Sequence, residues 1–137
     1  LGAGASFVAT TAEWMGSHFV DTLDAAFKHP GFSFVHIAQR CPKFNPTAWN
    51  FQDSSWLTFL VDEKNGIAAD QKAAPDSKIA SHSPCSYEDA IAVSKDVPNV
   101  FGLVYQEEKP MYDKLVIDAT KAQKQRSLDT LLDDYII

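Results

Sequence analysis

The stretch Gly31-Phe-Ser-Phe-Val-His-Ile-Ala-Gln-Arg-Cys-Pro-Lys-Phe-Asn-Pro46 decides the fold class of this chain. Its nearly continuous apolar run from Phe32 to Ala38 predicts a strand that is buried on both faces, as in a parallel sheet. Cys41 follows just past the carboxyl end of that strand, at the edge where open α/β sheets bind their ligands. Pro42 disfavours the helical conformation for Cys41, so we expect the thiol in a defined turn.

The preceding residues predict the rest of a strand–helix–strand unit. Residues 3–9 are small and apolar, which favours a short buried strand. Apolar residues recur three and four positions apart over 12–28 and predict an amphipathic helix, with the hydroxyls of Thr10 and Thr11 at its start. His29-Pro30-Gly31 ends this helix. Such a unit requires a right-handed crossover and parallel pairing of its two strands, so the sequence predicts an α/β fold with a mainly parallel sheet flanked by helices.

The second half of the chain predicts a further helix, a strand and a helical tail. Ser86, with Asp89 three residues later, resembles a capping box that starts a short helix ending near Lys95. Residues 100–105 predict a buried strand in which Gly102 allows a close backbone approach. From Met111 the pattern is helical again, with two apolar stripes: Leu115, Val116 and Ala119, and then Leu128, Leu131, Leu132, Tyr135 and Ile136.

Residues 42–85 form a long segment after the Cys-Pro turn, and prolines interrupt it repeatedly. It contains an aromatic and aliphatic patch too apolar for a solvated linker: Trp49, Phe51, Trp56, Leu57, Phe59, Leu60 and Val61. Packing of this patch on its own domain is the first interpretation. Contact with a partner subunit or with a cofactor region is the alternative.

The composition bounds the class of protein. A chain of 137 residues is one domain with a substantial core, and its net charge of -6 argues against a nucleic-acid surface. No apolar run approaches the roughly eighteen residues of a membrane helix. Two cysteines give no disulfide framework, so we expect a reducing cytoplasm. The chain begins at Leu1 within an apparent structural element, so we also expect a piece of a longer subunit.

Three segments, in order along the chain, resemble the thiamine-diphosphate-binding β subunit of 2-oxoacid:ferredoxin oxidoreductases. They are Gly2-Ala-Gly-Ala-Ser-Phe-Val-Ala9, then Gly31-Phe-Ser-Phe with Cys41-Pro42-x-x-Asn45, then Phe101-Gly-Leu-Val-Tyr-Gln106 followed by Pro110 and Tyr112. The Cys-Pro turn is the most specific of the three. The Gln39-Arg40 lead-in and the long segment after the turn look more like the 2-oxoglutarate enzymes than the pyruvate enzymes.

The resemblance implies a cofactor site at the turn. In that family Cys41 would be the fourth ligand of a [4Fe-4S] cluster, and Pro42 and Asn45 would belong to the same cofactor site. Lys43, Phe44 and Asn45 would shape the turn around the thiolate. The three other cysteines of such a cluster are absent from this sequence, as is the Gly-Asp-Gly…Asn motif that binds thiamine diphosphate and Mg²⁺. In the family these lie upstream of the matched segments. The isolated chain is therefore expected to be inactive and to hold no cluster alone.

The resemblance also implies an activity and a set of partners. The assembled enzyme would oxidatively decarboxylate a 2-oxoacid with coenzyme A to acyl-coenzyme A and CO2, or run the reverse carboxylation. Electrons would pass through the cluster to ferredoxin, and an α subunit and the remaining β-subunit residues would complete the enzyme. Residues 1–110 would be the C-terminal part of the thiamine-diphosphate-binding domain, and residues 111–137 a helical tail. No nucleic acid and no membrane is expected as a partner.

Other interpretations remain open from the residues alone. A non-enzymatic α/β interaction module could bind a protein through the 49–61 patch and the apolar C-terminal tail, with Cys41 merely structural. Cys85 is expected to be a structural or surface thiol, and a Cys41–Cys85 disulfide depends on geometry. The four histidines show no metal-ligand spacing, and His36, inside the predicted strand, is expected to be a core histidine.

Overall fold

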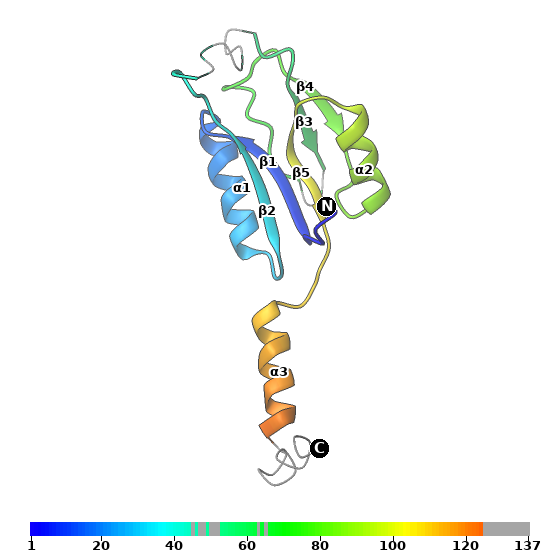
Figure 1. Ribbon diagram of the computed structural model, residues 1–137. Coiled ribbons are helices and arrows are strands. Elements are labelled where there is room, and N and C mark those ends of the chain that lie inside the picture. Colours follow the sequence, from blue (N-terminus) through cyan, green and yellow to red (C-terminus); the bar gives the residue numbers. More distant parts are fainter. Residues whose placement is uncertain (45, 47–48, 50–52, 63, 65, 125–137) are drawn as a thin grey trace.

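The computed structural model describes residues 1–44, 46, 49, 53–62, 64 and 66–124. Its elements follow in the order β1 (Phe7–Ala12), α1 (Gly16–Lys28), β2 (Ser33–Ala38), β3 (Thr58–Val61), β4 (Lys78–Ser81), α2 (Tyr87–Asp96), β5 (Val100–Gln106) and α3 (Tyr112–Lys124). The strands form one sheet in the order β2-β1-β5-β3-β4 (Figure 1). β1 pairs antiparallel with β5, and the other neighbours are parallel. The predicted mainly parallel α/β fold is confirmed.

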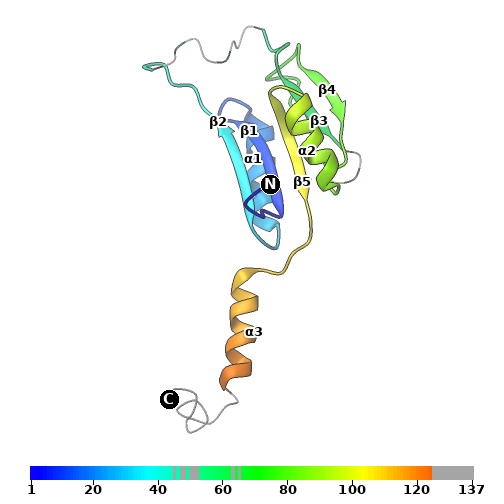
Figure 2. The same ribbon diagram turned by 45° about the vertical axis from the view of Figure 1, so that its right-hand side comes forward.

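Helices α1 and α2 cover opposite faces of this sheet (Figure 2). Alternate residues of β1 show the division, because side chains of a strand point to opposite faces in turn. Phe7 packs in a cluster with Ala25 and Ala26 of α1, whereas Val8 packs in a cluster with Ala90 of α2. The predicted parallel unit is also confirmed, since Phe7 to Ala12 pair in register with Ser33 to Ala38.

The predicted start of the first strand and of the first helix are both wrong by several residues. β1 covers 7–12 rather than 3–9, and α1 begins at Gly16 rather than at residue 12. Thr10 and Thr11 therefore lie in the strand and do not cap the helix, which begins after Met15 without a side-chain cap. The Thr11 hydroxyl instead shares a hydrogen bond of 2.9 Å with Nδ1 of the buried His18. β-branched threonines fit a half-buried strand as well as a helix cap. Here the strand conformation prevails, because β1 is paired on both sides.

β2 is not buried on both faces, contrary to the prediction. It is the edge strand of the sheet, and Phe34 and Ile37 are both exposed at its surface. Val35 packs toward α1, so Phe34 and His36 point to the opposite face by alternation. The expectation of a core histidine at His36 is wrong for the same reason, because its side chain is exposed. The described chain therefore leaves part of the apolar surface of β2 exposed.

The segment after the Cys-Pro turn holds two short strands, β3 and β4, which the sequence did not predict. The expected packing of its aromatic patch on its own domain is confirmed for the described members. Trp14, Trp49, Trp56 and Phe101 follow one another at ring-centroid distances of 6.1, 5.2 and 6.2 Å. Leu57, Phe59 and Leu60 are fully buried, whereas Phe51 lies outside the described residues.

The predictions for α2 and β5 are confirmed. The Ser86 hydroxyl accepts a hydrogen bond of 3.1 Å from the backbone N–H of Asp89, as a capping residue does. Gly102 has a φ of +118°, and a Cβ added there would lie 2.7 Å from the backbone oxygen of Leu60. Glycine is therefore required at this close approach of β5 to β3.

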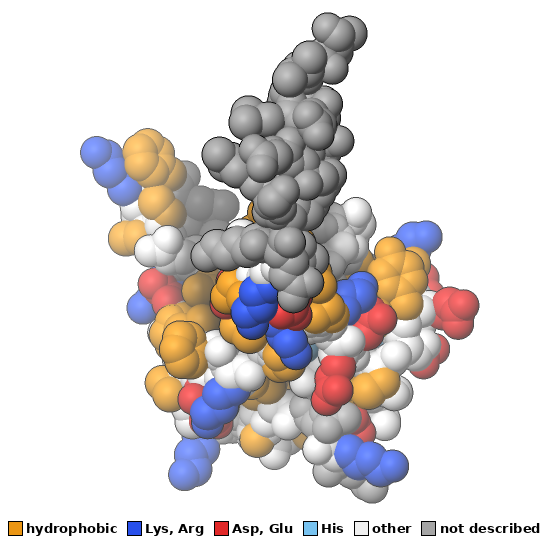
Figure 3. All heavy atoms as spheres, turned by 90° about the horizontal axis from the view of Figure 1, so that it is seen from below, with side chains coloured by type: hydrophobic (Ala, Val, Ile, Leu, Met, Phe, Trp, Pro, Cys, Tyr) orange, Lys and Arg blue, Asp and Glu red, His pale blue; other side chains and the backbone are white. Residues whose placement is uncertain are grey.

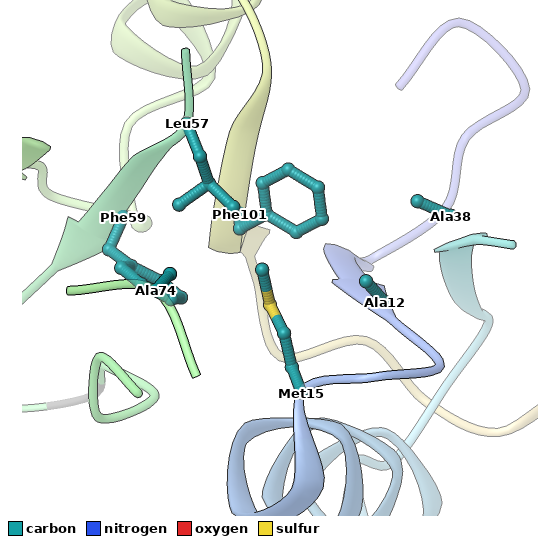
Figure 4. Packing of buried hydrophobic residues seen from close by; sticks show 7 residues of the cluster. All are labelled: Ala12, Met15, Ala38, Leu57, Phe59, Ala74 and Phe101. Atoms are coloured by element: carbon teal, nitrogen blue, oxygen red, sulfur yellow. The ribbon is translucent and has the colours of Figure 1, made fainter. Parts of the chain in front are cut away.

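One cluster joins the two halves of the sheet. It contains Ala12, Met15, Ala38, Leu57, Phe59, Ala74 and Phe101, and Figure 4 shows Phe101 and Met15 between the β3 side and the β1–β2 side. These residues come from β1, β2, β3 and β5 and from the loops between them. The cluster therefore holds the carboxyl ends of β1 and β2 against the later half of the chain.

α3 projects from the base of the sheet and contacts no other helix or strand of the described chain (Figure 1). Its predicted stripe of Leu115, Val116 and Ala119 is exposed. The second predicted stripe, from Leu128 to Ile136, lies outside the described residues. Seen from below, hydrophobic side chains lie at the surface in several separate places, interspersed with charged ones (Figure 3).

Candidate functional site

The candidate site lies where β1 and β2 end. Because the two strands are parallel, their carboxyl ends meet at one edge of the sheet. The backbone N–H of Glu13, directly after β1, donates a hydrogen bond of 3.1 Å to the carbonyl of Ala38, the last residue of β2. Cys41 follows three residues later and is half-buried. The predicted position of the thiol past the strand end is therefore found.

A carboxylate fixes the chain immediately before Cys41. Oε1 of Glu13 accepts hydrogen bonds from both the backbone N–H and the Nε–H of Arg40, each at 3.1 Å. The two side chains are 34% and 53% exposed, so their ion pair contributes at most about 1 kcal/mol to stability. The effect is geometric: one carboxylate at the end of β1 holds both the backbone and the side chain of the residue next to Cys41.

A cavity of about 390 Å³ lies beside this clamp and is lined by Glu13, Arg40 and Pro42. Pro42, the residue after Cys41, thus lines a cavity together with the two residues of the clamp. The ammonium of Lys43 lies 5.7 Å from the ring centroid of the exposed Phe44. Asn45, the remaining predicted site residue, lies outside the described residues.

The donor set at this edge fits one ligand of an iron-sulfur cluster and no more. A [4Fe-4S] cluster takes four thiolates, and among residues 1–124, apart from the undescribed positions, no three His, Cys, Asp or Glu side chains come together as a metal site. Cys41 and Cys85 do not form a disulfide, and Cys85 is exposed just before α2. Any cluster bound through Cys41 would take its other ligands from elsewhere, and the described residues hold no group of carboxylates for Mg²⁺.

The histidines contribute nothing to this edge. His18, His29 and His82 are buried at separate places, where they bond respectively to Thr11, Ser6 and the carbonyl of Val104. Burial lowers the pKa of both His18 and His29.

The burial of the aromatic patch weakens the interpretation of this chain as an interaction module. Trp49 and Trp56 pack against the central cluster, and Leu57 and Phe59 belong to it. The described part of the 49–61 patch is therefore occupied by the domain itself rather than presented to a protein partner.

Sequence reasoning missed the clamp of Glu13 on Arg40. Two charged residues 27 positions apart carry no spacing signal, and they meet only because β1 and β2 pair in parallel register. No direct signal was present in the sequence, because Glu13 fell within the helix predicted over 12–28; only the observed end of β1 at Ala12 places it beside the carboxyl end of β2. Once parallel pairing is assumed, residues after the two carboxyl ends are expected to be neighbours.

Fold and site together define an α/β domain with a mainly parallel sheet and a half-buried thiol beyond the carboxyl ends of β1 and β2. No protein-family model and no curated protein matches the sequence. Among solved structures, 99% of the chain is similar to a 2-oxoglutarate:ferredoxin oxidoreductase from Magnetococcus marinus, determined with 2-oxoglutarate, coenzyme A and succinyl-CoA bound. The TM-score is 0.68 at 16% sequence identity, so the likeness is one of fold. The chain spans 42% of the length of that chain.

None of the described helices combines the length and the apolar composition that a membrane-spanning helix needs.

Proposed function

We propose that this chain is part of the thiamine-diphosphate-binding β subunit of a 2-oxoacid:ferredoxin oxidoreductase. The observation that carries the proposal is the position of Cys41, half-buried in the turn after β2, within a fold similar to that of a 2-oxoglutarate:ferredoxin oxidoreductase. Two independent lines support it, since the sequence resemblance rests on the Cys-Pro turn and the structural likeness extends over 99% of the chain.

The reaction would be the oxidative decarboxylation of a 2-oxoacid with coenzyme A to acyl-coenzyme A and CO2, or its reverse. Two electrons leave the substrate and reach ferredoxin one at a time, which is the chemistry that a bound [4Fe-4S] cluster supplies. In this chain, Sγ of Cys41 would bind one iron of that cluster. The clamp of Glu13 on Arg40 would hold the turn so that the sulfur keeps its direction.

The other components would come from outside the chain. The remaining β-subunit residues would supply three cysteines and bind thiamine diphosphate and Mg²⁺, and an α subunit would complete the enzyme in the cytoplasm. Residues 1–110 would complete the thiamine-diphosphate-binding domain, and residues 111–137 would form its helical tail. The chain alone would then be inactive.

Pro42 would fix the turn, and Asn45 would donate a hydrogen bond that tunes the cluster potential. The preferred substrate in this proposal is 2-oxoglutarate.

A substrate assay on the native complex that contains this chain tests the proposal. We expect anaerobic reduction of ferredoxin that requires both coenzyme A and 2-oxoglutarate, and slower reduction with pyruvate. The same assay on Cys41→Ser should lose at least about tenfold in rate, because a ligand of the electron-transfer group is removed. The matched variant Cys85→Ser should keep its rate, since this exposed thiol lies outside the site. A complex that reduces ferredoxin with no 2-oxoacid would overturn the proposed function.

A further inference from the structure

Glu13 lies on the short connection between β1 and α1, which packing and hydrogen bonds hold in place. Ala12 and Met15, on either side of it, are fully buried in the central cluster. The backbone N–H of Met15 donates a hydrogen bond of 3.1 Å to the carbonyl of Ala12, and the N–H of Glu13 donates one of 3.1 Å to the carbonyl of Ala38 in β2. The carboxylate of Glu13 therefore starts from a backbone that is itself fixed, as a positioning residue requires.

The residues on either side of Cys41 are restrained by different means. Before it, the backbone N–H and the Nε–H of Arg40 both donate to Oε1 of Glu13, each at 3.1 Å. After it, Pro42 disfavours the helical conformation of Cys41. The backbone bond of Arg40 restricts the peptide unit that leads into the turn. The direction of the Cys41 side chain therefore depends on Glu13, although Glu13 lies 28 positions away in the sequence.

The same carboxylate balances a positive charge next to the thiol. Arg40 and Pro42, the two neighbours of Cys41, line one cavity of about 390 Å³ together with Glu13, so the ion pair belongs to the surroundings of the thiol. The Glu13 side chain is 34% exposed, so solvent screens its charge only in part. The reduction potential of an iron-sulfur cluster depends on the net charge around it. Loss of either partner of this ion pair would therefore change the potential of a cluster bound at Cys41.

We propose that Glu13 is a positioning residue for the thiolate of Cys41 and has two separable effects. Through the backbone N–H of Arg40 it holds the direction of Sγ. Through the guanidinium it balances a cation whose charge would otherwise favour the reduced, more negative state of a bound cluster. The inference rests on the proposed function, because a potential exists only if Cys41 binds a group that accepts electrons.

Two conservative variants of the native complex separate these effects. Glu13→Gln keeps an oxygen acceptor at the same reach and removes the charge. It should raise the midpoint potential in a redox titration followed by electron paramagnetic resonance, and leave amide hydrogen exchange at Arg40 as in the wild type. Glu13→Asp keeps the charge but shortens the side chain. It should make the Arg40 amide exchange at least about fivefold faster, the factor expected for loss of one net hydrogen bond, with a smaller change in potential.

The sign of the charge effect has its own test. Arg40→Ala removes a positive charge beside Cys41 and should lower the midpoint potential, opposite to Glu13→Gln. A shift of the same sign in both variants would contradict the charge balance.

The matched control is Asp24→Ala, which removes the carboxylate of a different exposed ion pair. Asp24 is 54% exposed and pairs with Lys28 at 2.6 Å, near the far end of α1. This variant should keep both the wild-type potential and the wild-type exchange at Arg40. If Glu13→Gln matches it in potential, or Glu13→Asp matches it in exchange, the inference is wrong. Where Cys41→Ala still alters a cluster signal, that result overturns only the role of Glu13. Where Cys41→Ala leaves the spectrum unchanged, the proposed function itself fails, and the inference fails with it.

Discussion

Phe101→Ala is expected to lower the free energy of unfolding by about 3–5 kcal/mol. Phe101 is 2% exposed and packs in the cluster that joins the two halves of the sheet (Figure 4). Its ring also meets the edge of Trp56, with centroids 6.2 Å apart. Truncation removes the buried ring and leaves a cavity bounded by backbone from several strands, which cannot close around it.

The matched control is Phe27→Ala, the same change at a side chain that is 90% exposed on α1. It should change the free energy of unfolding by less than about 0.5 kcal/mol, because nothing buried is removed. Urea unfolding followed by tryptophan fluorescence gives both values. Equal losses at the two positions would contradict the central role of this cluster.

A loss of stability on mild acidification is the second large effect that we expect. His18 is fully buried, shares a hydrogen bond with Thr11, and lies with its ring centroid 5.1 Å from that of Phe59. Its Nε2 has no hydrogen-bond partner. Burial lowers the pKa of His18 from 6.5 to about 4, although the charges of Asp70 and Asp21 act in the opposite direction.

The sign follows from proton binding. Between pH 6.5 and about 4, the unfolded chain binds a proton at His18 that the folded chain does not, so stability falls as the pH falls. The contribution of the neutral His18 to the free energy of unfolding is complete above pH 6.5. Below that pH it decreases by up to about 1.4 kcal/mol per pH unit, or by roughly 2 kcal/mol in all at pH 5. The pKa of His29 is also lowered by burial and acts in the same direction.

Urea unfolding at several pH values compares the wild type with His18→Gln, which keeps a neutral polar side chain. The variant should lose much of the slope between pH 6.5 and 5, whereas His36→Gln, at an exposed position of β2, should keep it. Parallel profiles for wild type and His18→Gln would show that this imidazole does not control the acid sensitivity.

Where a single residue sets the local backbone conformation, the sequence predicted the structure. Pro30 and Gly31 end α1, the Ser86 hydroxyl caps α2, and Gly102 permits the close approach of β5 to Leu60. In each case one residue imposes a conformation regardless of the rest of the fold. The parallel pairing of β1 with β2 also follows from the strand–helix–strand order.

The failures concern properties set by distant residues. β3 and β4 are four residues each, and their pairing with β5 and with one another depends on partners that sequence order does not reveal. The exposure of β2 depends on what covers it rather than on its own apolar residues. Within the candidate site, Cys41 and Pro42 were predicted from the turn, whereas Glu13 became visible only through parallel register.

Anaerobic electron paramagnetic resonance of the dithionite-reduced native complex tests most directly whether Cys41 is an iron-sulfur ligand. Wild type is compared with Cys41→Ala and with the control Cys85→Ala. The proposed function predicts that Cys41→Ala abolishes or markedly alters one cluster signal, with impaired electron transfer to ferredoxin, while Cys85→Ala matches the wild type. An unchanged spectrum and unchanged turnover in Cys41→Ala would mean that this thiol only packs, and would contradict the assignment.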